Sequence, residues 1–280
     1  TGKRHDFQIS YKVGFEDNGL INSVIVDQAM RCGMSWDLSE AIAARAMCHA
    51  ENSYFIKNMR ITSHRLKTNT QSNTAFRGFG GPQGIVGMER VIDHVAYHLN
   101  IDPLLVRERN FYPHKTSTEY GKTPYGQTVH DCVIQDIISE LKKTSNYFER
   151  RQSIEKFNKN NAFLKRGIAL TPVKFGISFN ASFLNQAGAL LHVYNDGSVY
   201  LNHGGTEMGQ GLNTKIAQIV ANEFKLPLNK IKITATSTGK VPNTSATAAS
   251  SGSDLNGMAA KNAAEKIKSR MAEYLSLIHI

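Results

Sequence analysis

The chain has 280 residues, with 33 Lys and Arg against 23 Asp and Glu, and a formal net charge of +10. Apolar residues make up 41% and charged residues 20%, which are the proportions of a folded globular chain rather than a disordered one. No run of about 18 apolar residues occurs, which excludes a membrane-spanning helix. Cys32, Cys48 and Cys132 form no CxxC pair and are too few for an iron–sulfur cluster, so we expect a reducing, cytoplasmic location.

The first predicted domain, residues 1–112, opens with a hairpin. Apolar and polar residues alternate from Phe7 to Val13, turn residues follow at Asp17–Gly19, and a second apolar run covers Leu20–Val26. Residues 37–49 have helical composition, and Asp37 with Glu40 resembles a capping box. Pro82 opens a helix with 3.6-residue periodicity that stops at Asn100, and Asp102-Pro103 starts a short helix.

Residues 113–165 are predicted to be a connector with one helix over Asp131–Leu141 and a solvated polar stretch at Lys156–Arg166. The second domain, 166–274, contains a hairpin of Ala189–Tyr194 and Val199–His203 around an Asn-Asp-Gly turn. A helix follows the glycine-rich loop 204–211, a short strand covers Ile231–Ala235, and a long Ala/Lys-rich helix ends the domain. The sequence therefore predicts an α/β (α+β) protein of two parts.

Three loops, 77–81, 204–211 and 244–252, are rich in glycine or small residues and precede helices. Such junctions expose backbone N–H groups to the positive end of the helix dipole, which suits an anionic ligand. None contains the GxxxxGK[ST] or GxGxxG pattern of the usual nucleotide-binding loops. We expect a phosphate-bearing ligand other than a standard NAD or ATP, provided that the loops converge.

Several chemically suggestive side chains also have ordinary interpretations. Glu207 is a candidate base, but we favour a carboxylate bonded to nearby backbone N–H groups. His94 and His98 have zinc-ligand spacing without a third ligand, which favours two solvated histidines. Phe175 and Phe179 are core candidates, and Arg77 suits either a planar oxyanion or plain solvent.

Four runs together resemble the molybdenum-cofactor part of the xanthine dehydrogenase/aldehyde oxidase family. They are SNTAFRGFGGPQG (72–84), KFGISF with LNQAGALLHVYNDGSV (174–199), HGGTEMGQG (203–211) and VPNTSATAAS (241–250). Their order and separations also match, and the resemblance covers nearly the whole chain. It implies a two-part molybdopterin-binding module, truncated at both ends, with the pterin bound between its halves.

The resemblance also implies roles for individual residues. The cofactor-binding residues would be Arg77, Met208, Gly209, Gln210, Thr247, Ala248, Ala249 and Ser250. Arg77 and Ala249 would contact the Mo-molybdopterin, Ala249 through its backbone, without being direct side-chain ligands of the metal. Phe79 and Phe179 would hold the substrate ring, and Arg45 would orient a purine and stabilise negative charge on it. Asn180 matches a substrate-contacting position that is Thr in some relatives.

The implied activity is oxidation of hypoxanthine and xanthine to urate with oxygen from water. Electrons would pass through 2Fe-2S clusters and FAD, on absent domains or partner subunits, to NAD, and the full enzyme would be a homo-oligomer. An aldehyde or other N-heterocycle hydroxylase of the same family is the alternative, and Arg45 favours the purine. No KAxGEPP-type motif, which would supply the general-base glutamate, occurs in the chain, so no catalytic residue is assigned and we expect an inactive internal fragment.

Two further expectations concern the charge and the end of the chain. The net charge alone supports a basic nucleic-acid-binding module, but no recognised nucleic-acid-binding motif accompanies it, so we expect no nucleic-acid partner and no membrane partner.

Residues 275–280 read LSLIHI, which is the translation of a transposon end used as a sequencing adaptor. We expect these six residues to derive from that adaptor; the alternative is an apolar end of the preceding helix.

Overall fold

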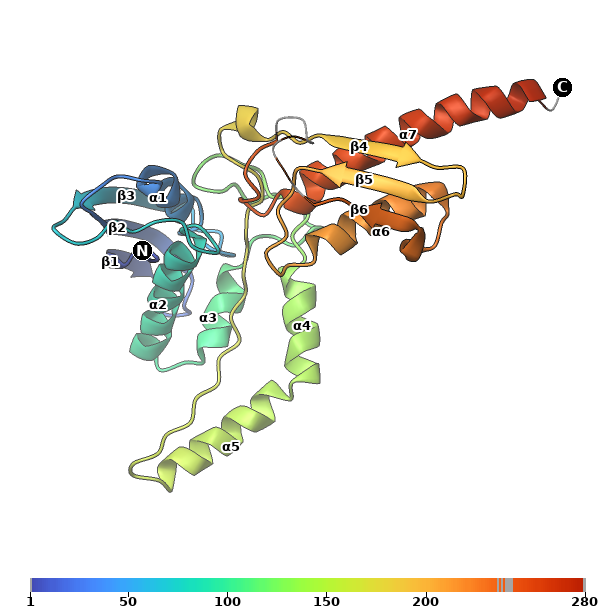
Figure 1. The fold of residues 1–280 in the computed structure, drawn as a ribbon. Coiled ribbons are helices and arrows are strands. Elements are labelled where there is room, and N and C mark those ends of the chain that lie inside the picture. Colours follow the sequence, from blue (N-terminus) through green and yellow to red (C-terminus); the bar gives the residue numbers. More distant parts are fainter. Residues whose placement is uncertain (1, 236, 238, 240–243, 279–280) are drawn as a thin grey trace. The chain divides into compact units, whose positions relative to one another are not determined.

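The computed structural model describes residues 2–235, 237, 239 and 244–278. The chain divides into two compact units, Thr1–Phe175 and Gly176–Ile280, called the first and second unit below (Figure 1). Each unit combines a small three-stranded sheet with helices, which confirms the mixed α/β prediction. The domain boundaries expected at residues 112 and 165 stay predictions. No helix of the described residues is long and apolar enough to cross a membrane.

The sheet of the first unit has the order β1-β2-β3. β1 (Phe7–Phe15) and β2 (Ile21–Gly33) form the predicted antiparallel hairpin, whose turn needs Gly19 at φ 90°. β3 (Asn58–Lys67) pairs parallel to β2 and was not expected from the sequence. Parallel neighbours need a crossover, and α1 (Ser39–Cys48) lies in the segment that joins them.

Three helices of the first unit test the capping predictions. α2 (Gly81–Leu99) ends at Asn100 with left-handed φ 54°, as predicted, and α3 (Pro103–Asn110) is capped by Asp102, which accepts the Leu104 N–H at 2.7 Å. The capping box predicted at Asp37 is wrong. Asp37 has φ 43°, outside the extended conformation of an N-cap, and α1 begins two residues later after Leu38 with no side-chain cap.

The segment 113–165 contains two helices rather than the single one predicted. α4 (Ile134–Thr144) replaces the expected 131–141 helix, and α5 (Tyr147–Lys159) includes the start of the stretch expected to be a solvated connector. Ile138 and Tyr147 are buried in the main core of the first unit with Val91, Val95 and their neighbours. The segment thus contributes side chains to that core.

The second unit packs two helices on the sheet β4-β5-β6. β4 (Ala189–Val193) and β5 (Val199–His203) form the predicted hairpin, and β6 (Ile231–Ile233) pairs parallel to β5. α6 (Leu212–Phe224) and α7 (Gly252–Ile278) enclose the core with residues such as Ile216, Val220 and Ala260. Short 3₁₀ turns cover Ser182–Leu184 (η1) and Leu228–Lys230 (η2). α7 continues through residue 278, while 279–280 lie outside the described residues, and the adaptor origin of 275–280 stays a prediction.

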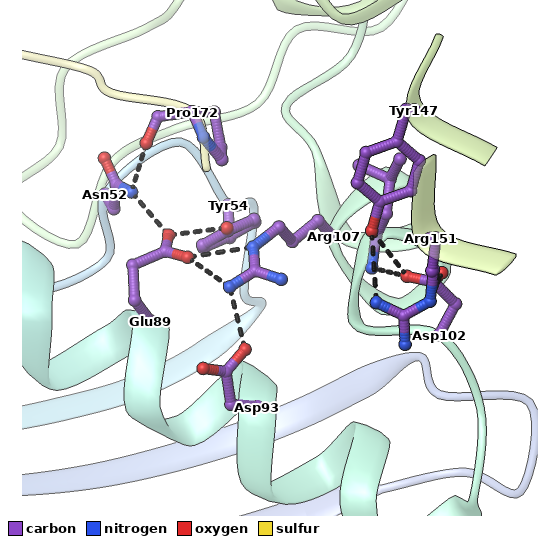
Figure 2. Close-up of polar contacts among 10 residues, drawn as sticks. Asn52, Tyr54, Glu89, Asp93, Asp102, Arg107, Tyr147, Arg151 and Pro172 are labelled. Atoms are coloured by element: carbon purple, nitrogen blue, oxygen red, sulfur yellow. Dashed lines mark hydrogen bonds and ion pairs between the residues drawn. The ribbon is translucent and has the colours of Figure 1, made fainter. Parts of the chain in front are cut away.

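A buried ionic network joins the elements of the first unit (Figure 2). The Glu89 carboxylate on α2 accepts hydrogen bonds from Asn52 Nδ2 at 2.8 Å, Tyr54 OH at 2.6 Å and Arg107 Nε of α3 at 2.9 Å. Arg107 is 2% exposed and also binds Asp93 at 2.9 Å. Burial, then Glu89, raises the pKa of Tyr54, so this hydroxyl stays a donor. The buried charges are therefore paired and hydrogen-bonded, as stability requires.

We predict that Glu89→Gln destabilises the first unit by about 3 kcal/mol, because it leaves the buried Arg107 with only its partly exposed partner Asp93. The free energy of unfolding from chemical denaturation measures the change. The matched control is Glu155→Gln, which removes an exposed ion pair with Arg151 and should cost about 0.5 kcal/mol or less. Equal effects of the two substitutions would contradict the prediction.

Candidate functional site

In the first unit, the loop that precedes α2 carries Arg77 and Phe79. Gly78 and Gly80 have φ of 93° and 95°, and a Cβ on Gly80 would lie 2.1 Å from the carbonyl oxygen of Ile42 in α1. Glycine is therefore required for this loop to approach α1. The half-buried Phe79 has φ 50° and packs with Ile42 and its neighbours, whereas the Arg77 side chain is exposed. The α2 N-terminus has no side-chain cap, which leaves it suited to an anion.

Arg45 lies in α1, the helix that the same loop contacts. It is 7% exposed, and burial lowers the pKa of its guanidinium from the usual value. The guanidinium carbon lies 5.4 Å from the centroid of the Phe175 ring. A buried arginine of this kind suits recognition of a planar, electron-rich ligand atom more than it suits a surface role. The first unit thus brings together the three predicted residues Arg45, Arg77 and Phe79 on α1 and the adjoining loop.

In the second unit, the two predicted cofactor loops lie side by side. Thr206 N–H donates to Thr247 Oγ1 at 2.8 Å, and a Cβ on Gly204 would lie 2.5 Å from Thr244 Cγ2. Ser178 N–H donates to the Ala249 carbonyl at 2.8 Å. The loop 204–211 and the KFGISF segment, through Ser178, both contact the loop 244–250, so the two predicted cofactor loops of this unit converge.

Glu207 acts on the backbone of its own loop. Its carboxylate accepts the N–H groups of Gly209, Gly211 and Asn213 at 2.9, 3.0 and 3.0 Å. These bonds, led by that from Asn213, lower the pKa of Glu207. The favoured interpretation of Glu207 is confirmed. The expectation that this loop offers its N–H groups to an external anion needs correction, because Glu207 already binds three of them at the start of α6.

Gln210, another predicted residue of that loop, contacts the loop backbone through its side-chain amide. Gln210 Oε1 accepts the Met208 N–H at 2.5 Å, and its Nε2 donates to the Thr206 carbonyl at 2.9 Å. The Met208 side chain is 66% exposed, and a Cβ on Gly209 would meet nothing within 4 Å. Gly209 is needed for its φ of 91° rather than for packing. The exposed parts of this loop therefore include the Met208 side chain and the backbone at Gly209.

The second loop has backbone strain at two predicted residues. Ala249 and Ser250 have φ of 54° and 57°, a conformation that costs free energy in residues with a Cβ and that gathers at functional sites. Within the described part of the chain, neither N–H group has a hydrogen-bond acceptor. Thr247 Oγ1 accepts from Thr206 and keeps its own hydrogen to donate. This donor set fits the oxygen-rich, anionic molybdopterin.

Phe179 and Asn180 follow in the same unit. The backbone of the half-buried Phe179 is held at two points, since its N–H donates to Asn185 Oδ1 at 2.8 Å and its carbonyl accepts from Asn185 Nδ2 at 2.9 Å. Asn180 is exposed at the chain surface. Asn185 was not singled out from the sequence, because an asparagine six residues away carries no signal of this contact.

The histidine pair gives no support for a zinc site. His94 is hydrogen-bonded to Tyr11, and His98 packs edge-on against Phe15 with ring centroids 5.6 Å apart. Among the residues that the structure describes, no group of three or more His, Cys, Asp and Glu side chains could hold a metal ion. Both histidines are exposed, as expected.

Comparison with known proteins defines the class. Two family profiles, both described as molybdopterin cofactor-binding domains, match residues 1–111 and 140–279. The chain therefore belongs to the molybdopterin cofactor-binding family, and the resemblance to the xanthine dehydrogenase/aldehyde oxidase type is confirmed. Molybdopterin is accordingly its cofactor class.

Individual relatives agree with this class. The chain is 47% identical over 275 residues to a xanthine dehydrogenase of Blastobotrys adeninivorans, covering 98% of this chain and 19% of that protein. It is 48% identical over 271 residues to one of Dictyostelium discoideum, covering 97% and 20%. The chain thus spans about a fifth of the length of the curated relatives that it matches.

Solved structures show the same fold at low sequence identity. The quinoline 2-oxidoreductase of Pseudomonas putida 86 matches with a TM-score of 0.82 at 21% identity, covering 96% of this chain and 35% of that one. The CO dehydrogenase of Oligotropha carboxidovorans matches with a TM-score of 0.82 at 23% identity, covering 95% and 35%.

We predict that Glu207→Gln lowers the unfolding midpoint at neutral pH, and that the difference from wild type shrinks as the pH falls below about 4.5. The folded pKa of Glu207 is depressed, so its stabilisation is present above the unfolded pKa and is lost as the carboxylate protonates. Thermal unfolding between pH 3 and pH 7 measures the difference. The exposed Glu273→Gln is the control, and a pH-independent difference for Glu207→Gln would contradict the prediction.

Proposed function

We propose that the protein to which this chain belongs is a molybdenum hydroxylase that oxidises hypoxanthine and xanthine towards urate with water as the oxygen source. The observation that carries the proposal is the buried Arg45 guanidinium on α1, beside the loop of Arg77 and Phe79. A buried arginine there binds a purine carbonyl oxygen and stabilises the negative charge that develops on the ring. The xanthine dehydrogenase relatives support the same substrate class.

The chain's own residues divide the task of binding. In the first unit we assign molybdopterin binding to the Arg77 guanidinium. In the second unit we assign it to Met208–Gln210 and Thr247–Ser250, including the Thr247 hydroxyl and the N–H groups of Ala249 and Ser250, which have no acceptor among the described residues. Phe79 and Phe179 hold the substrate ring, and Asn180 contacts its edge. The bound cofactor supplies an oxygen atom derived from water and accepts two electrons. Arg45 orients the substrate for that step.

Other parts of the complete protein would complete the reaction. We place the 2Fe-2S clusters and FAD that carry electrons to NAD, and the general-base glutamate, outside these 280 residues, and we expect the complete enzyme to be a cytoplasmic homo-oligomer. The structure gives no disulfide to Cys32, Cys48 or Cys132, which fits a reducing compartment. The 280-residue chain by itself would then bind without turnover. Oxidation of aldehydes or other N-heterocycles is the alternative outcome of the test below.

We predict that Arg45→Met, in the protein expressed from its complete gene, lowers kcat/KM for xanthine about a hundredfold or more while aldehyde turnover survives. Steady-state urate formation and aldehyde oxidation measure the two activities. Arg166→Met is the matched control, because Arg166 also lies over a phenylalanine, Phe157 of α5, at 3.8 Å, but its side chain is exposed and lies beyond the end of that helix. A wild-type enzyme that oxidises aldehydes but not purines would favour the alternative substrate class.

We also predict that Gly204→Ala lowers the molybdenum content of the purified protein severalfold. The added Cβ would lie 2.5 Å from Thr244 Cγ2 and would push apart the two loops that present the cofactor donors. Gly167→Ala is the control, because a Cβ there meets nothing within 4 Å. Metal analysis of both variants tests the assignment, and equal molybdenum contents would contradict it.

A further inference from the structure

Phe175 occupies a position in the first unit that the proposed function leaves unused. Its half-buried ring lies 4.7 Å from the His49 ring, between centroids, and 5.4 Å from the Arg45 guanidinium carbon. A Cβ on Gly81, at the start of α2, would lie 2.4 Å from Phe175 Cε2. The ring therefore fills the space between α1 and the first turn of α2, which only a glycine at position 81 permits.

The segment that carries this ring is fixed at several points. Asn52 Nδ2 donates to the Pro172 carbonyl at 2.9 Å, and Asn52 Oδ1 accepts the Lys174 N–H at 3.0 Å (Figure 2 shows the first contact). The Lys174 ammonium forms an ion pair with Glu51, whose side chain is 1% exposed. Asn52 is itself held by Glu89 of the buried network. Phe175 thus follows a segment with little freedom to shift, and its ring position is set in advance.

The charges around Arg45 make this aromatic contact energetically significant. His49 donates its Nδ1–H to the Arg45 carbonyl at 2.8 Å. Burial lowers the pKa of His49, and the positive charges of Arg45 and Lys174 lower it further, while this hydrogen bond acts in the opposite direction. His49 is therefore neutral near pH 7 and adds no further positive charge beside the guanidinium. A cation over an aromatic face is stabilised more strongly when it is removed from water, and here the Arg45 guanidinium is buried while the Phe175 ring is half-buried.

We propose that Phe175 is a positioning residue that determines the preference for purines by holding the Arg45 guanidinium in its binding orientation. It acts through Arg45 rather than through contact with the substrate. Lys174, Asn52 and Glu51 serve the same end by fixing the segment that bears Phe175. This inference rests on the proposed function, because it assigns a role within purine recognition.

The test compares Phe175→Leu with Phe157→Leu in the protein expressed from its complete gene. Phe157 is the matched control, because it also lies under an arginine, Arg166, away from Arg45. We expect Phe175→Leu to raise KM for xanthine about tenfold and to leave kcat/KM for an aromatic aldehyde within about twofold. Phe157→Leu should change neither value, and Phe175→Trp should restore much of the purine affinity.

A double variant separates positioning from a general loss of structure. Phe175→Leu in the Arg45→Met background should cost little further, because the residue that it positions is already gone. Glu51→Gln, which removes the ion pair of Lys174, should shift KM for xanthine in the same direction if Phe175→Leu fails to fold. Equal losses for purine and aldehyde, or additive effects in the double variant, would overturn the inference alone. A wild-type enzyme without purine oxidation would instead refute the proposed function itself.

Discussion

The Glu89 carboxylate is the contact on which the first unit depends. It joins α2 to Arg107 of α3 and to Asn52 and Tyr54 of the segment after α1, all within 2.9 Å. Because Arg107 is buried, loss of this partner would leave its charge with only the partly exposed Asp93. The orientation of α2 fixes the loop of Arg77 and Phe79 at its N-terminus, and Asn52 fixes the segment that leads to Phe175. One partly buried carboxylate thus stabilises both the loop of Arg77 and Phe79 and the segment that leads to Phe175.

In the second unit, the loop 244–252 carries two strained residues, Ala249 and Ser250, whose backbone N–H groups are donors. The Glu207 carboxylate accepts N–H groups at the start of α6, whereas the N–H groups of Ala249 and Ser250 have no acceptor among the residues that the structure describes. Gly204 and Thr206 hold the loop 204–211 against the loop that contains these two residues. A carboxylate internal to the loop thus provides rigidity, while the neighbouring loop provides the open N–H groups.

Local patterns predicted those parts of the fold whose cause is local. The hairpins at Gly19 and Gly197 and the α2 helix ending at Asn100 follow from turn chemistry and periodicity, and all were predicted correctly. β3 was missed because its pairing with β2 is non-local and most of its residues are exposed, so no strict alternation marks it. Asp37 was wrongly predicted to be a helix N-cap, because aspartate is a common N-cap residue but its backbone φ of 43° does not fit that role.

In the candidate site, too, local contacts could be predicted from the sequence and contacts between distant residues could not. The motifs located the loops, and the nature of the Glu207 contacts was predictable because its partners lie within six residues. The contacts of Lys174 with Glu51 and of Asn52 with Pro172 join residues 123 and 120 positions apart, which no single-sequence pattern reveals. Phe175 was accordingly classed as a core candidate, whereas the structure places it under a buried guanidinium.

We expect this chain to supply the molybdopterin-binding residues of its protein. The most direct measurement is the amount of pterin and molybdenum released from the purified protein, expressed from its complete gene, relative to the chain concentration. Both should be present in an amount equal to that of the chain when the protein is made in cells that synthesise the cofactor. A folded protein isolated from such cells without pterin or molybdenum would contradict it.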